Sequence, residues 1–183
     1  FKIDNYDMCI NLNYKYKSSA YNNRGVSKGD LKDYYGAITD YTKAISLKPD
    51  NADAYTNRGL TKIYLKDYYG ATTDFTKAIS LKPDNADDYY NRGFSKDGLK
   101  DYYGAIADYT KAISLNPDYA YAYYSRGTSK TYLKDYYGAI ADYTKAISLN
   151  PDYAYAYYSR GTSKTYLKDY YGAIADYTKA ISL

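Results

Sequence analysis

Arginine and aspartate recur together along this chain of 183 residues in a pattern that could do chemistry. Five arginines stand 34 residues apart, and each is followed at a constant offset by an aspartate. The arginines are Arg24, Arg58, Arg92, Arg126 and Arg160, and the aspartates are Asp40, Asp74, Asp108, Asp142 and Asp176. A guanidinium can bind a carboxylate through two parallel hydrogen bonds. The pattern therefore predicts either a ladder of arginines that grips an acidic ligand or an Arg–Asp pair inside each repeated segment.

Little else in the composition favours catalysis. The chain has no His and no Glu, and its Asp residues are evenly spread, so acid–base chemistry would need Asp, Lys or Tyr in a closed pocket. One cysteine, Cys9, excludes an internal disulfide and matches no zinc or redox pattern. The glycines occur singly and form no phosphate-binding loop. We predict that the chain is not an enzyme and has no catalytic residue, cofactor or metal site.

Charge and hydropathy limit the classes of partner. The net charge of +4 is mildly basic, whereas nucleic-acid domains concentrate far more charge on one face. The repeated lysines alternate with Asp, which is typical of a solvated surface. No apolar run approaches the 18 or more residues of a membrane span. We expect neither nucleic acid nor membrane as a partner, and the cysteine content favours a cytoplasmic location.

The elements that position these residues follow from the same interval. Four prolines and five glycines keep the 34-residue period, which is typical of a stack of identical supersecondary units. In the fourth repeat, Asn116-Pro117-Asp118 predicts a turn. The apolar spacing then predicts a helix A from about Ala120 to Leu133 and a helix B from about Tyr137 to Leu149. Asp135 is the expected N-cap of helix B, and the short connection makes the two helices antiparallel.

The period divides nearly the whole chain. The predicted repeats are residues 18–51, 52–85, 86–119, 120–153 and 154–183, the last without its closing loop. Residues 1–17 align with a helix B of a preceding degenerate repeat, in which Ile3, Tyr6 and Ile10 fill core positions and Cys9 packs as a small apolar residue. Residues 99–149 are identical to residues 133–183, so the last repeats are recent copies.

A family resemblance rests on residues of the fourth repeat. It reads Tyr123-x-x-Arg126-Gly127-x-x-Lys130, then Ala139-x-x-x-Tyr143 and Pro151. This pattern closely resembles the tetratricopeptide repeat, and the resemblance covers essentially the whole chain. It implies an all-α fold, a right-handed α-solenoid (superhelix) of antiparallel helix–turn–helix repeats with a 34-residue period.

Two departures from the family pattern bear on the arginines. The family's Leu is Arg in every repeat, and its Tyr is Lys in every repeat, as at Arg126 and Lys130. A charge in a packed position needs a partner. We therefore predict a pair between Arg126 and Asp142, and its equivalents elsewhere, rather than a ligand-binding ladder.

The resemblance also implies a function and a surface. Family members are protein–protein interaction scaffolds whose A helices line a concave groove that holds a partner's peptide or helix. The outward A-helix residues predicted to bind a partner are Asn57, Tyr90, Asn91, Phe94, Tyr121, Tyr124, Thr128, Tyr155, Tyr158 and Thr162. Tyr offers a large contact area at low rotamer cost, although these tyrosines could instead only shield the helices. No A helix has an outward Lys in its first two turns, so we expect no carboxylate clamp.

Two other functions stay open at this stage. The repeats could be an accessory array of a larger enzyme, and a weaker alternative is RNA binding by helical repeats. The chain begins at Phe1 and stops where earlier repeats read Lys-Pro or Asn-Pro, which suggests a segment of a longer protein. Because Ile174 and Ile181 of the last helix would be uncovered, we expect end-to-end self-association or a continuing stack.

Overall fold

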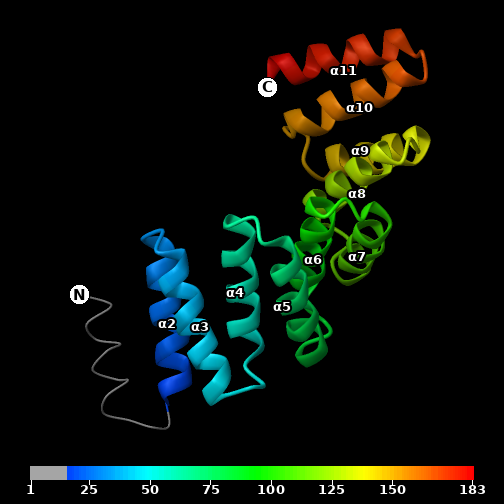
Figure 1. Cartoon of the computed structure of the whole chain (residues 1–183). Helices are drawn as coiled ribbons and strands as arrows, with labels where there is room; N and C mark the ends of the chain where they lie inside the picture. The colour runs from blue at the N-terminus through cyan, green and yellow to red at the C-terminus, as the bar shows by residue number, and fades with distance from the viewer. Residues whose placement is uncertain (1–15) are drawn as a thin grey trace. The chain divides into compact units, whose positions relative to one another are not determined.

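The computed structural model describes residues 16–183, and in this range the regular secondary structure is helical, with no strand (Figure 1). The helix predicted for residues 1–17 lies outside the described residues, except for Tyr16 and Lys17. Lys17 is the first residue of the first described helix. The helices are α2 (Lys17–Asp30), α3 (Tyr34–Leu47), α4 (Ala52–Tyr64), α5 (Tyr68–Leu81), α6 (Ala86–Gly98), α7 (Tyr102–Leu115), α8 (Ala120–Tyr132), α9 (Tyr136–Leu149), α10 (Ala154–Tyr166) and α11 (Tyr170–Ser182).

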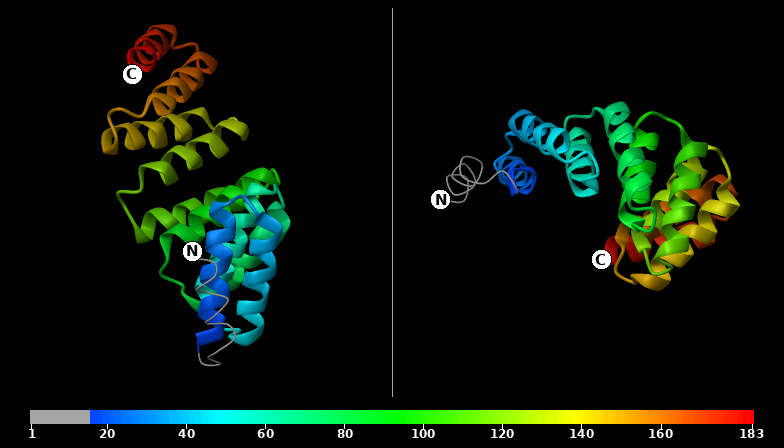
Figure 2. Two further views of the ribbon diagram at one scale, coloured as in Figure 1. Left: turned by 90° about the vertical axis from the view of Figure 1, so that its left-hand side faces the viewer. Right: turned by 90° about the horizontal axis from the view of Figure 1, so that it is seen from below.

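The helices fall into two compact units. The first runs up to Leu99 and contains α2 to α6, and the second, Lys100–Leu183, contains α7 to α11. Within each unit an even-numbered A helix packs on the odd-numbered B helix that follows it, as α4 does on α5 and α10 on α11 (Figure 2). These helix–turn–helix pairs stack one on the next, which makes the fold an α-solenoid.

Polar caps fix where the B helices begin. The carboxylate of Asp135 accepts a hydrogen bond from the backbone N–H of Gly138 (3.0 Å), which confirms it as the N-cap of α9. Equivalent aspartates cap the other B helices: Asp33, Asp67, Asp101 and Asp169. The lysine before each cap turns the chain with a φ of 60–66°. That left-handed conformation ends the A helix without the glycine that usually supports it.

Small residues let the two helices of a repeat approach closely. Ala139 and Ala146 of α9 are fully buried, as is the ring of Tyr143. Gly127 of α8 lies against that ring, because a β-carbon at residue 127 would come within 2.8 Å of it. On α8, the buried residues also include Ala122 and Ser129, which the apolar spacing did not indicate. The core of each repeat is therefore built from alanines around one aromatic ring.

The stacking brings A helices together. Each B helix contacts the A helix of the next repeat, as α3 does α4 and α9 does α10. A helices also contact one another, α2 with α4 and α8 with α10, whereas no such contact joins B helices within either unit as described. The A helices therefore lie closer to one another than the B helices do within each unit. No helix of residues 16–183 is both long and apolar enough to cross a membrane.

Candidate functional site

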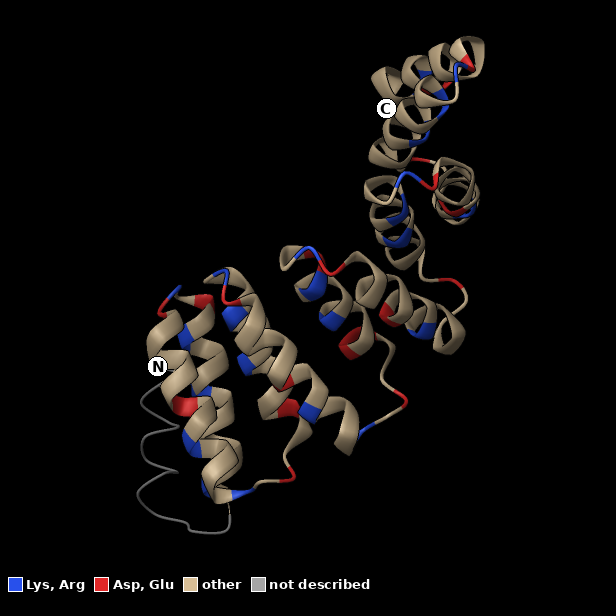
Figure 3. Ribbon diagram, turned by 45° about the vertical axis from the view of Figure 1, so that its right-hand side comes forward, with Lys and Arg blue, Asp and Glu red and all other residues tan. Residues whose placement is uncertain are grey.

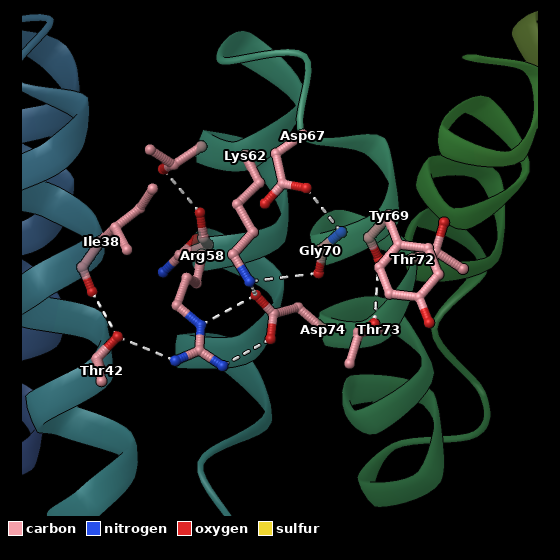
Figure 4. Close-up of polar contacts among 12 residues, drawn as sticks. Ile38, Thr42, Arg58, Lys62, Asp67, Tyr69, Gly70, Thr72, Thr73 and Asp74 are labelled. Atoms are coloured by element: carbon pink, nitrogen blue, oxygen red, sulfur yellow. Dashed lines mark hydrogen bonds and ion pairs between the residues drawn. The ribbon is translucent and has the colours of Figure 1, made fainter. Parts of the chain in front are cut away.

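The Arg–Asp pairs have the predicted geometry. In the second repeat, Arg58 donates from Nε to Asp74 Oδ2 (2.9 Å) and from Nη2 to Asp74 Oδ1 (2.7 Å), as Figure 4 shows. The Asp74 side chain is almost completely buried, whereas the Arg58 side chain is partly exposed. The same two bonds join three further pairs, Arg24–Asp40, Arg126–Asp142 and Arg160–Asp176. These four pairs confirm the prediction made from the constant offset.

A lysine completes each of these four clusters. Lys62 contacts Asp74 at 2.8 Å and donates to the carbonyl of Gly70 at 3.3 Å (Figure 4). Lys28, Lys130 and Lys164 contact the aspartates of their own repeats at 2.8–3.0 Å. The sequence marked these lysines as departures from the family pattern but did not predict their partner, because a long flexible stem leaves the reach of Lys open.

The arginines also hold adjacent repeats together. Nη1 of Arg58 donates to the hydroxyl of Thr42 on the preceding B helix (3.0 Å). The guanidinium lies over the ring of Tyr55, 5.6 Å from its centroid. Equivalent bonds join Arg126 to Thr110 and Arg160 to Thr144. Because both edges and one face of the guanidinium are engaged, these arginines act as structural ties and the ligand-ladder alternative loses its support.

In two of the clusters the basic residues lower the pKa of the aspartate. Burial would by itself raise the pKa of Asp40, but hydrogen bonds and charge from Arg24 and Lys28 outweigh it and hold that pKa below its ordinary value. The pKa of Asp176 is lowered by the same balance, with Arg160 and Lys164 as the partners. Both carboxylates are therefore charged at neutral pH, which is the state that the arginine fork requires.

An aromatic hollow on the second unit gathers three of the residues predicted for partner binding. Tyr124 of α8 and Tyr155 and Tyr158 of α10 line a surface hollow of about 440 Å³. Ala154, Ser159 and Ala180 complete its lining. Tyr155 and Tyr158 are largely exposed, 72% and 58%, while Tyr124 is half-buried against Tyr143 and Tyr153. The hollow is thus lined by one half-buried tyrosine that packs on two other rings and by two largely exposed tyrosines.

The other predicted residues of the second unit, Tyr121, Thr128 and Thr162, are not in the lining of this hollow. Thr128 donates to the carbonyl of Tyr124 and accepts from the buried hydroxyl of Tyr143. Thr162 makes the corresponding contacts with Tyr158 and Tyr177. Both threonine hydroxyls are therefore used inside the fold. Tyr121 is exposed and packs edge-on against Tyr153, with ring centroids 5.4 Å apart.

The predicted residues of the first unit have a different character. The side-chain amide of Asn57 donates to the side-chain oxygen of Asn22 on the neighbouring A helix (3.1 Å). Asn57 also lines a hollow of about 340 Å³ with Val26, Leu60 and Tyr64 among its walls. Tyr90 and Asn91 of α6 are half-buried, and Phe94 is exposed. This hollow of the first unit combines the Asn57 amide with tyrosine rings and, unlike the hollow of the second unit, has the charged residues Asp30 and Lys32 in its lining.

Asp88 is a buried carboxyl that the sequence did not single out. It is fully buried on α6, in a position occupied by Ala20, Ala54, Ala122 and Ala156 in the other repeats. The hydroxyl of Thr56 (2.7 Å) and the amide of Asn85 (2.9 Å) donate to it. Burial raises the pKa of Asp88, and the negative charges of Asp87 and Asp53 add to that effect.

Tyrosine contacts between repeats were also missed. Tyr136 at the start of α9 stacks on Tyr166 at the end of α10, with centroids 4.7 Å apart and planes within 8°. Tyr153 stands at the N-cap position of α10, where earlier repeats have Asn51 or Asn85, and packs against the core instead of capping the helix. The chain has 32 tyrosines, so residue type alone could not tell stacked, core and surface rings apart.

Charges are mixed over both units. Figure 3 shows lysine and arginine interspersed with aspartate along the helices and connections of each unit. The hollow of Tyr124, Tyr155 and Tyr158 has no charged residue in its lining. Within residues 16–183, no group of three or more potential ligands is arranged to hold a metal ion.

Stacked antiparallel helix pairs, tied by a recurring Arg–Asp–Lys cluster, define a helical repeat protein of the α-solenoid class. Models of the tetratricopeptide repeat match residues 52–85, 86–119, 120–153 and 154–183, and a TPR-repeat model matches residues 30–66. The chain belongs to the tetratricopeptide-repeat family. Such arrays are typically non-catalytic scaffolds for protein interaction.

Solved structures agree with this assignment. The crystal structure of MamA protein is 27% identical to the chain, with a TM-score of 0.87 and 92% of each chain covered. MamA from Desulfovibrio magneticus RS-1 is 22% identical, with a TM-score of 0.87, covering 91% of this chain and 94% of that one. YrrB, described as a TPR protein with an unusual peptide-binding site, is 23% identical, with a TM-score of 0.84, covering 98% of this chain and 92% of that one. No curated protein matches the sequence.

Proposed function

We propose that this chain is a scaffold that binds a segment of a partner protein on the exposed surface of its A helices and has no catalytic activity of its own. The observation that carries the proposal is the aromatic hollow of Tyr124, Tyr155 and Tyr158. Exposed tyrosines held in fixed positions lose little side-chain entropy on binding. A concave, mainly apolar site with a few hydroxyl groups is the usual form of a binding pocket.

The chemistry of the hollow favours an uncharged ligand. Its lining is aromatic or small, with hydroxyl groups on the tyrosines and Ser159. We infer that an apolar or aromatic side chain of the partner fills the hollow, while the hydroxyls bind the neighbouring peptide groups. Nucleic acid is a poor fit, because its affinity comes largely from cations placed against phosphates. The peptide-binding site ascribed to YrrB, which shares the fold, supports a peptide as the class of ligand.

The first unit extends the proposal to a second contact region. Asn57 and Asn91 lie on successive A helices, where amides can bind the backbone of an extended peptide. The side-chain amide of Asn57 already donates to Asn22, so its oxygen is the group proposed to bind a ligand. Phe94 adds an exposed apolar contact on α6. A peptide held here would be recognised more by its backbone than by its side chains.

Selection from a random peptide library tests the proposal. Peptides selected on the whole chain are expected to lose binding at least about tenfold when Tyr124 and Tyr158 are both replaced by Ala. The matched control is Tyr137→Ala, which removes a ring that is 77% exposed at the start of a B helix. Equal binding to both variants, or selection of no peptide at all, would refute the proposed site.

A further inference from the structure

A hollow of the first unit lies where the first repeat departs from the others at two neighbouring positions. Gly29 stands at a position that the other repeats fill with a side chain: Ile63, Asp97, Thr131 and Thr165. Asp30 stands where they have Tyr64, Gly98, Tyr132 and Tyr166. Both residues line the hollow of about 340 Å³, which is formed by residues of α2, α3 and α4 (Figure 1). Among the repeats, only the first has a carboxylate at the position of Asp30.

The fourth and fifth repeats show what fills the same place elsewhere. Between them, the hydroxyl of Thr131 lies 3.1 Å from the hydroxyl of Tyr143 and 3.4 Å from that of Ser163. The corresponding residues of the first two repeats are Gly29, Tyr41 and Thr61. The nearest neighbour of a β-carbon at residue 29 would be the Tyr41 hydroxyl, at 4.0 Å. The first repeat therefore leaves space beside a buried tyrosine hydroxyl where the fourth has a threonine.

The polar groups around this space favour a hydrogen-bond donor. The hydroxyl of Thr61 donates to the backbone carbonyl of Asn57 (2.9 Å), so it accepts the bond that it shares with Tyr41 and leaves the Tyr41 oxygen able to accept from a ligand. The exposed carboxylate of Asp30 makes no ion pair with any lysine or arginine of residues 16–183. Burial raises the pKa of Tyr41 to about 12, and the charge of Asp30 adds to that effect, so this negative charge reaches the wall of the hollow.

The fold itself shows which cation is held by a carboxylate and a tyrosine ring. Arg58 bonds both oxygens of Asp74 and lies over the ring of Tyr55, 5.6 Å from its centroid. In each of the five repeats an arginine lies over a tyrosine ring in this way, at 5.2–5.6 Å. A guanidinium suits these two partners better than an ammonium does, because it is planar and presents five N–H donors.

The hollow offers the same two kinds of partner to an arginine from another molecule. Besides Asp30, its lining includes the rings of Tyr34 and Tyr64, which are stacked with centroids 5.4 Å apart and planes within 2°. Lys32, in the turn after α2, also lines the hollow and opposes a cation. A lysine occupies that turn in every repeat, however, and the side chain of Lys32 is exposed. The charge that distinguishes this hollow from the equivalent places in other repeats is therefore negative.

We propose that the hollow beside Gly29 binds the guanidinium group of an arginine in the partner protein, with the carboxylate of Asp30 and the oxygen of Tyr41 as acceptors. A partner segment as the source of this arginine rests on the proposed function, in which Asn57 of the same hollow binds the peptide backbone. The arginine adds one side-chain preference to a region that otherwise binds backbone groups. Because the hollow of the second unit accepts an uncharged side chain, the two hollows select different residues of the partner.

A capped single residue tests the hollow without a peptide. The probe is N-acetyl-arginine methylamide, titrated into the whole chain and followed by NMR through the backbone amide signals of Gly29 and Thr61. We expect saturable shifts with a Kd on the order of 1 mM, as befits so small a ligand. Gly29→Thr fills the hollow and should weaken binding at least about tenfold. This variant should keep the fold, because Thr131 and Thr165 stand at the same position, and circular dichroism checks it.

Two charge variants should change the affinity in opposite directions. Asp30→Asn should weaken binding of the probe about threefold, and Lys32→Gln should strengthen it about twofold, because exposed charges contribute modestly. An anionic ligand would reverse both signs. The norleucine and lysine analogues of the probe should bind more weakly than the arginine probe. Tyr35→Ala, which removes a ring that is 76% exposed at the start of α3, is the matched control and should leave binding unchanged.

Failure of this test and failure of the proposed function are separate results. Absence of saturable shifts, undiminished binding to Gly29→Thr, reversed signs at Asp30 and Lys32, or equal binding of the norleucine or lysine analogue would overturn the guanidinium site. None of these outcomes concerns the aromatic hollow of the second unit. Probe binding without selection of any peptide, or tighter binding of free arginine than of the capped residue, would overturn the partner protein as the source of the arginine.

Discussion

Gly127 on α8 lies so close to Tyr143 on α9 that a β-carbon at residue 127 would be 2.8 Å from ring carbon Cε1. The same β-carbon would be 3.2 Å from the carbonyl oxygen of Ala139. The ring of Tyr143 is fully buried, so it has no free space into which it could move. The glycine is required by the approach of two helices and not by its backbone conformation, which is helical.

Gly127→Ala should therefore lower the free energy of unfolding by about 1–3 kcal/mol, because overpacking outweighs the better helix propensity of Ala. Gly29→Ala is the matched control, because the nearest neighbour of its β-carbon would be the Tyr41 hydroxyl at 4.0 Å. That change should stabilise the chain by up to about 1 kcal/mol. Urea denaturation followed by circular dichroism measures both, and changes of the same sign would contradict this account.

The buried Arg126–Asp142 pair should show strong coupling in a double-mutant cycle. Replacing Arg126 by Met leaves the carboxylate of Asp142 with Lys130 as its remaining cationic partner and should cost about 3 kcal/mol. The coupling with Asp142→Asn is expected to be about 1–3 kcal/mol. The exposed pair of Lys82 and Asp53, 2.6 Å apart, is the control and should couple much more weakly. Equal coupling in the two cycles would remove burial as the reason for the pair's strength.

Asp88 should make stability depend on pH in the sense opposite to the paired aspartates. Its pKa is raised in the folded chain, so its contribution to stability is greatest below the ordinary value of 3.8 and is lost as pH rises through the folded value. Asp88→Ala should therefore stabilise the chain at pH 7, by about 1 kcal/mol, and give less advantage at pH 4.

The readout for Asp88 is the difference in unfolding free energy between variant and parent at the two pH values. Taking this difference cancels the opposite trend from Asp40 and Asp176, whose pKa values are lowered and whose contribution is lost as pH falls. Thr39→Ala, at an exposed position without a titratable group, is the control and should show no such trend. If the stability advantage of Asp88→Ala over the parent became larger toward pH 4, the raised pKa assigned to Asp88 would be contradicted.

Replacing Lys134 by glycine should affect stability more favourably than replacing a lysine within a helix by glycine. Its φ of 63° is a left-handed conformation that costs a side-chain residue about 1–2 kcal/mol. Because the entropic cost of glycine is smaller, about 0.5–1 kcal/mol, Lys134→Gly should raise the midpoint of urea unfolding. Lys145→Gly, on the exposed side of α9, should lower it. Destabilisation by both changes would show that Lys134 makes a contact that outweighs its strain.

The repeat period predicted the helices and the Arg–Asp pairs because both depend on spacing, which the sequence shows directly. The Arg126–Asp142 pair follows from an offset that never changes, and the Asp135 cap follows from its position before a helix. The stack of Tyr136 on Tyr166 depends on ring orientation across a repeat boundary, which spacing does not carry. Asp88 was missed for a different reason, since a single substitution in an alanine position leaves the period unchanged.

The candidate site divides in the same way. Sequence reasoning placed Tyr124, Tyr155 and Tyr158 on the outward side of their helices, and the structure brings them around one hollow. It gave Thr128 and Thr162 the same role, but their hydroxyls bond within the fold. A helical wheel shows which way a side chain points and not whether a neighbour already uses its polar atoms.

The bond from Arg126 to Thr110 and the bond from Arg160 to Thr144 are both 3.0 Å long, and the segments that form them, residues 99–132 and 133–166, have identical sequences. The two interfaces between adjacent repeats are therefore equivalent. A gene that gains or loses 34 codons in this region encodes a chain in which every interface between adjacent repeats has the sequence of an existing interface. Recombination can therefore lengthen or shorten the array in one step without a compensating substitution. The length of the array is therefore the property of this protein that mutation can change most readily, more than the chemistry of its surface.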